Sequence, residues 1–122
     1  MTREYKEKGV NQMNQMDPNA IADLEQDLKD FAPDLVKYAI DFAYGEVIPR
    51  PGLDLRSKEI ATIAALTTLG HPRPELKTHI KKALHIGISI EELKELMIHL
   101  MIYTGFPTAI NGMTALKEVV EK

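Results

Sequence analysis

Residues 60–69 read IATIAALTTL, and this stretch decides the fold. Its side chains are apolar or small almost all the way round a helix, which is typical of a central helix covered by other helices. Asp54 can cap the start of this helix, which is expected to run to Gly70. Because no segment shows the period-two alternation of a strand, the sequence predicts an all-α protein of about six helices.

Start and stop signals on the C-terminal side predict three more helices. They run from Pro74 to Gly87, from Ser89 to Gly105 and from Pro107 onward. The second begins with the capping box Ser89-Ile90-Glu91-Glu92, which is a strong start signal. Three lysines of the first are expected to face solvent, namely Lys77, Lys81 and Lys82.

On the N-terminal side, Asp17-Pro18 and Pro33 each open a helix, and Gly45 can close the second one. Residues 46–53, EVIPRPGL, are expected to form a loop, because two prolines and a glycine forbid regular structure. Residues 1–16 form a polar arm that is helical only if something packs on it. The arm precedes a single helical domain, residues 17–122.

The composition excludes several classes of protein. The chain has 122 residues, 44% of them hydrophobic, which is enough for one core. Its net charge of −3 lacks the basic surplus that nucleic-acid binding needs. No apolar run approaches the roughly 18 residues of a membrane span, and the N-terminus has no apolar signal segment, so we expect a cytoplasmic protein. The absence of cysteine removes disulfides, thiolate nucleophiles and cysteine zinc sites.

Self-association is expected from the two most apolar helices, 54–70 and 89–105. A single layer of short helices cannot cover both of them, so the surplus apolar surface is predicted to face another copy of the chain.

Two residues in apolar surroundings are candidates for acid–base chemistry, His79 and Glu59. The alternative for His79 is a core-edge histidine bonded to a carbonyl, and for Glu59 an exposed charge paired with a basic neighbour. Packing or exposed positions are expected for the other histidines, His71, His85 and His99. No two histidines are three or four residues apart, so we expect no metal site.

Glu46 and Arg50 flank the rigid loop and place a carboxylate and a guanidinium near one mouth. Arginine can bind a substrate carboxylate through two parallel hydrogen bonds. A salt bridge within the loop is the alternative.

Four stretches occur in a familiar order: FAYGEVIPRPGLD (42–54), RSKEIATIAALTTLG (56–70), ELKTHIKKAL (75–84) and GISIEELKELMIHLMIYTGFPTAINGM (87–113). Over about residues 35–120 the chain resembles the carboxymuconolactone decarboxylase family, which also contains AhpD-like alkylhydroperoxidase proteins. Tyr44 stands where the decarboxylase branch usually has tryptophan. The peroxidase branch has Cys-x-x-Cys before the histidine that matches His79, and here that turn is His71-Pro72-Arg73-Pro74. Glu59 matches the glutamate of the peroxidase branch's proton relay.

The resemblance implies an all-α fold, assembly into homotrimers or homohexamers, and a pocket near His79. It also implies a cofactor-independent lyase of aromatic catabolism that converts 4-carboxymuconolactone to 4-oxoadipate enol-lactone. Arg50 and Tyr44 would bind the substrate carboxylate, His79 would return the proton, and Glu46 or Glu59 would orient or recharge His79. At about 1.5 Å per residue, simple antiparallel helices leave Glu59 and His79 roughly 9 Å out of step, so only water or a bent packing would join them.

Two other functions are compared with this one. A non-enzymatic oligomer that binds a small acid or an accessory partner is the alternative. A peroxiredoxin-type activity is excluded, because no side chain can cycle as a thiol. The expected partners are other copies of the chain and a small carboxylate, with no nucleic acid and no membrane.

Overall fold

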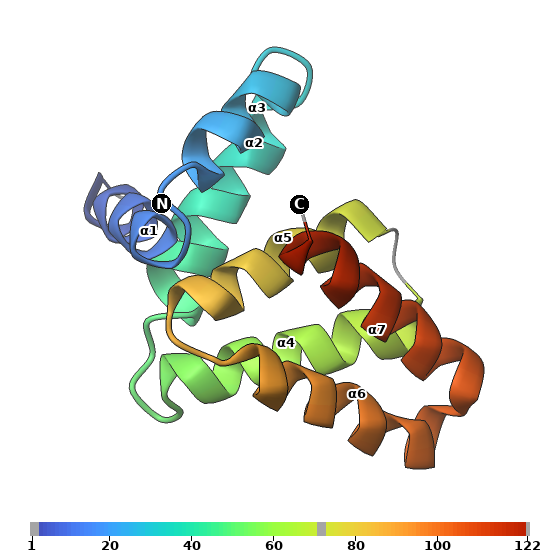
Figure 1. The fold of residues 1–122 in the computed structure, drawn as a ribbon. Coiled ribbons are helices and arrows are strands. Elements are labelled where there is room, and N and C mark those ends of the chain that lie inside the picture. Colours follow the sequence, from blue (N-terminus) through green and yellow to red (C-terminus); the bar gives the residue numbers. More distant parts are fainter. Residues whose placement is uncertain (1–2, 71–72, 122) are drawn as a thin grey trace. The chain divides into compact units, whose positions relative to one another are not determined.

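The computed structural model describes residues 3–70 and 73–121, and within them the chain is helical with no strand (Figure 1). This confirms the all-α prediction. The chain divides into two compact units, residues 1–55 and 56–122. The helices of the first unit are α1 (Arg3–Met16), α2 (Ala20–Leu28), α3 (Pro33–Lys37) and the π-helix η1 (Tyr38–Val47), and those of the second are α4 (Leu55–Leu69), α5 (Arg73–His85), α6 (Ile90–Thr104) and α7 (Phe106–Val120).

In the first unit, the polar arm is a helix because α1 packs against η1. Met13 and Met16 are buried, and Gly9 and Gly45 lie where the two helices approach. A Cβ on Gly45 would overlap the backbone carbonyl oxygen of Tyr5, so only glycine permits this approach. The prediction that Gly45 closes a helix is therefore wrong. Its missing side chain serves packing between helices.

The helix that follows Pro33 changes to π-helical bonding at Tyr38 and continues to Val47, so the loop begins later than predicted. The N–H of Ile48 donates to the carbonyl oxygen of Ala43, five residues back, at 2.9 Å. The buried residues of η1 follow the wider turn, in two adjacent pairs: Ile40 with Asp41, and Tyr44 with Gly45.

The start of α2 also differs slightly from the prediction, because the helix begins at Ala20 and not at Pro18. The carboxylate of Asp17 accepts a hydrogen bond from the N–H of Asn19 at 2.9 Å and stabilises a turn before the helix.

In the second unit, α4 to α7 enclose a hydrophobic core. Ile63 of α4, Ile80 of α5, Met97 of α6 and Leu116 of α7 are almost completely buried in it. The predicted boundaries hold: Gly70, Gly87 and Gly105 have φ values of 70°, 100° and 87°. The Ser89 capping box is present, with the Glu92 N–H donating to Ser89 Oγ at 3.0 Å.

The second unit leaves a large apolar surface uncovered in the single chain. Leu69 ends α4 exposed, and apolar side chains of α6 and α7 lie in solvent, namely Ile98, Ile102, Tyr103, Phe106 and Ile110. The single chain therefore does not cover all of α4 and α6, and self-association stays a prediction.

One solvent-facing assignment is wrong. Lys82 is only 3% exposed, whereas Lys81 is exposed and Lys77 bonds Glu118 at 2.7 Å. Lys82 lies three residues after His79 on α5 and so belongs to the same side of that helix.

Candidate active site

The central feature of the candidate site is a direct contact between Glu59 of α4 and His79 of α5. Glu59 Oε1 lies 2.8 Å from His79 Nδ1. The glutamate side chain is 3% exposed and the imidazole 18%, so the pair lies at the edge of the core with the imidazole partly open. A charge-assisted hydrogen bond in such surroundings is stronger than one in water.

This contact overturns the expected separation of roughly 9 Å. That offset assumed parallel helix axes that start at the same height, and the sequence imposes neither condition. The contact also decides between the alternatives for both residues. Glu59 is not an exposed helix-end charge, and His79 bonds a carboxylate in place of a backbone carbonyl. Arg56, a basic neighbour of Glu59 on α4, pairs with Glu92 of α6.

The arrangement assigns a different role to each member of the pair. A carboxylate at Nδ1 accepts the Nδ1–H and fixes the orientation and tautomer of the ring. The other nitrogen, Nε2, is then the atom of His79 that can exchange a proton with a bound molecule. The pair thus consists of a proton-transfer residue and the residue that orients it.

In the first unit, Glu46 and Arg50 line one groove of about 650 Å³. Both side chains are exposed, Glu46 near the end of η1 and Arg50 just after it. Tyr44 is buried on η1 and does not line this groove. The other wall comes from α1, through residues that sequence reasoning did not identify: Tyr5, Lys8, Asn11, Gln12 and Gln15.

Residues 33–118 match the family model described as Carboxymuconolactone decarboxylase family. The chain belongs to this family. It is 37% identical over 94 residues to 4-carboxymuconolactone decarboxylase of Acinetobacter baylyi, which covers 77% of this chain and 69% of that protein. It is 28% identical over 81 residues to nitrosuccinic acid decarboxylase of Metarhizium robertsii, covering 66% of this chain and 55% of that protein. An uncharacterized protein of Methanocaldococcus jannaschii is 31% identical over 74 residues, covering 61% and 68%.

Family membership agrees with the distribution of the candidate residues. Glu59 and His79 both lie inside the matched region, as do Tyr44, Glu46 and Arg50. The α1 wall of the groove lies before that region. The groove therefore combines residues that the family model covers with residues that it does not.

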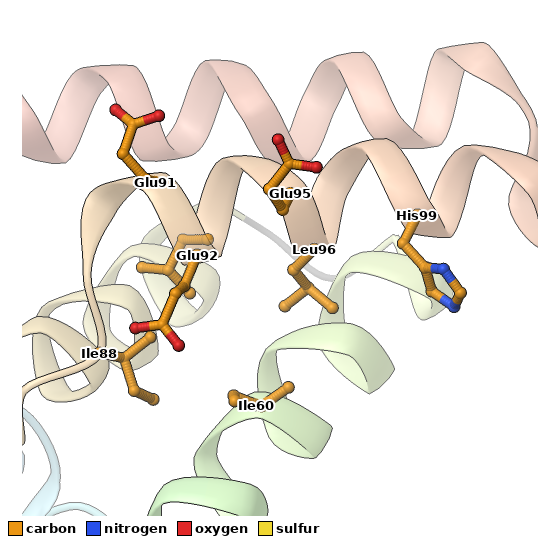
Figure 2. A pocket seen from close by; sticks show the side chains of 8 residues that line it. Ile60, Ile88, Glu91, Glu92, Glu95, Leu96 and His99 are labelled. Atoms are coloured by element: carbon orange, nitrogen blue, oxygen red, sulfur yellow. The ribbon is translucent and has the colours of Figure 1, made fainter.

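A second cavity, of about 450 Å³, lies within the second unit (Figure 2). Figure 2 shows Leu96 of α6 pointing toward Ile60 of α4, with Ile88 at one end and His99 at the other. Three carboxylates belong to its lining: Glu91, Glu92 and Glu95. Two of these carboxylates are paired with cations, Glu91 with Lys94 and Glu92 with Arg56.

Neither His85 nor His99 is part of the Glu59–His79 pair. His85 is exposed at the end of α5, and the His99 ring lies 5.6 Å from the Tyr103 ring, tilted by 54°. His71 lies outside the described residues. Across residues 3–70 and 73–121, no group of three or more metal-binding side chains gathers. Over the same part of the chain, no helix is long and apolar enough to cross a membrane.

Proposed function

We propose that this protein is a cofactor-independent decarboxylase of a small carboxylic acid such as 4-carboxymuconolactone, an intermediate of aromatic catabolism. The contact between Glu59 and His79 carries the proposal, because it provides an oriented imidazole partly open to a ligand. The names of two relatives, 4-carboxymuconolactone decarboxylase and nitrosuccinic acid decarboxylase, support the reaction class.

The proposed reaction consists of the loss of CO₂ and the return of a proton. The bond between the substrate carbon and its carboxylate breaks, CO₂ leaves, and the electron pair moves through the conjugated double bond into the lactone carbonyl as an enolate. Protonated His79 then gives the Nε2 proton to the enolate carbon next to that carbonyl, so the new double bond stays at the carbon that lost CO₂, and solvent returns a proton to the imidazole. Glu59 keeps the ring oriented and stabilises the imidazolium between turnovers.

Arg50 is the proposed anchor for a substrate carboxylate, and the groove beside it suits a small acid. Its volume of about 650 Å³ lies within the usual range for small-molecule sites. Glu46 lines the same groove, and in this proposal its carboxylate limits by repulsion how the acid can lie.

The test is a substrate screen with the purified protein. 4-Carboxymuconolactone, nitrosuccinate and related unsaturated acids are incubated with it, while ultraviolet absorbance and CO₂ release are followed. Protein-dependent CO₂ release from one of these acids is the expected result. Binding of an acid without CO₂ release would instead identify a non-enzymatic small-acid-binding protein.

We also propose that the protein works as a homo-oligomer, a trimer or a hexamer. The support is the exposed apolar surface of α6 and α7, where Ile102 is 71% exposed and Phe106 64%. Light scattering on the wild type tests this, and a mass of 13.7 kDa, that of a single chain, would contradict it.

A further inference from the structure

The groove beside Arg50 has one wall that the family model does not cover. The matched residues begin at 33, whereas α1 spans Arg3–Met16 and lines the groove opposite the end of η1. A contribution from α1 to ligand binding would therefore come from residues outside the part of the chain that matches the family model.

The position of α1 relative to η1 is fixed by close contact of the two backbones. A Cβ on Gly9 would overlap the carbonyl oxygen of Ile40, and one on Gly45 would overlap that of Tyr5. Met13 and Met16 are buried beside this contact. Side chains on α1 thus face the groove from a rigid support, which lowers the entropy cost of binding a ligand.

The groove side chains of α1 suit an oxygen-rich anion. Lys8 supplies an ammonium group that forms an ion pair with Glu4 at 3.2 Å. Both side chains of this pair are exposed, so breaking it costs little free energy. Three neutral amides can donate to carbonyl or carboxylate oxygens, namely Asn11, Gln12 and Gln15. With Arg50 on the other wall, the groove lining has two cations and one carboxylate, that of Glu46, so it carries a net positive charge for an acid with two polar ends.

We propose that α1 is the specificity wall of the acid-binding groove, and that Lys8 and the α1 amides bind the polar end of a dicarboxylate-like ligand away from Arg50. This inference rests on the proposed function.

The experiment uses two matched pairs of variants on the full chain. Lys8 lines the groove and Lys6 does not, although both are exposed on α1, so Lys8→Gln and Lys6→Gln remove the same charge. Asn11 lines the groove and Asn14 does not, so Asn11→Asp and Asn14→Asp add the same charge. Steady-state kinetics are measured on the acid found in the screen, and calorimetric titration with glutarate, an unreactive dicarboxylate, reports binding alone.

Lys8→Gln and Asn11→Asp are each expected to raise KM about three- to fivefold with kcat unchanged, and to weaken glutarate binding to the same extent. Lys6→Gln and Asn14→Asp are expected to leave both quantities at the wild-type value. If the two variants of a pair change KM and glutarate binding equally, the inference is wrong. The proposed function would still stand in that case, provided that the wild type releases CO₂ from an acid. Glutarate binding that only the groove variants weaken, in a protein that releases CO₂ from no acid, would support the inference and overturn the decarboxylase. A wild type that neither turns over an acid nor binds glutarate would overturn both.

Discussion

Replacing Glu59 by glutamine tests the role of the Glu59–His79 pair directly. The variant keeps the size and shape of a side chain that is 3% exposed, and it removes only the negative charge 2.8 Å from His79 Nδ1. If the carboxylate stabilises the imidazolium that gives the proton, the variant should lower turnover without disturbing the fold.

The size of the effect follows from the change in one hydrogen bond. A hydrogen bond to a charged group contributes about 1.5–3 kcal/mol, and a neutral one about 0.5–1.5 kcal/mol. The difference, about 1–1.5 kcal/mol, corresponds to roughly a five- to tenfold lower kcat. His79→Gln removes the proton donor itself and should cost about 100-fold or more.

Stability should move differently from activity. Burying a carboxylate carries a desolvation cost, which a neutral amide of the same shape largely avoids. We therefore expect Glu59→Gln to melt at or above the wild-type temperature, while its kcat falls. A purely structural pair would give the opposite result, a lower melting temperature with normal turnover per folded molecule.

The double variant completes the test. Because Glu59 is proposed to act only through His79, Glu59→Gln combined with His79→Gln should be no slower than His79→Gln alone, within about twofold. Rates come from CO₂ release and stabilities from thermal melts on the same samples. Wild-type kcat in Glu59→Gln, or a double variant in which the two losses multiply, would refute the reasoning.

Three further predictions concern packing, assembly and chemistry. Gly45→Ala should lower the free energy of unfolding by about 1–3 kcal/mol, because its Cβ would overlap the Tyr5 carbonyl oxygen. Gly52→Ala is the matched control, because a Cβ there meets nothing within 4 Å. Equal melting temperatures for the two variants would contradict the packing argument. Ile102→Lys places a charge on a side chain that is 71% exposed and should reduce the mass measured by light scattering while circular dichroism is unchanged; an unaltered oligomer would show that this face is not the interface. Iodoacetamide should leave kcat unchanged because the chain has no cysteine, and rapid inactivation at modest dose would show that another nucleophile is essential.

Helix boundaries with explicit chemical signals could be predicted from the sequence. The Ser89 capping box begins α6 as expected, and helices end near Gly70, Gly87 and Gly105 as expected, where the structure shows positive φ values. Gly45 shows where such reasoning fails, because a glycine that ends a helix and one that admits a neighbouring backbone look the same in one dimension. Only the packing of α1 against η1 shows that Gly45 admits a neighbouring backbone and does not end a helix.

The two candidate residues could be chosen from the sequence, but the contact between them could not be predicted. His79 and Glu59 stood out as ionisable groups in apolar surroundings, yet their contact depends on how α4 and α5 cross, which residue spacing does not determine. Lys82 was assigned to solvent from its charge alone and is buried. The α1 wall of the groove was missed because polar residues on a polar helix carry no signal until a second element faces them.

The π-helical bonding of η1 has a consequence for changes in chain length. Each turn of η1 holds more residues than an α-helical turn, so the segment Tyr38–Val47 has room to lose a residue and revert to ordinary helix. Such a deletion would change which side chains of the segment face α1, because wide and ordinary turns bring different residues to the same side of a helix. Gly45 and Gly9 would then no longer meet, and the groove lined by Glu46 and Arg50 would lose its wall from α1. In this segment, conserving length matters as much as conserving side chains.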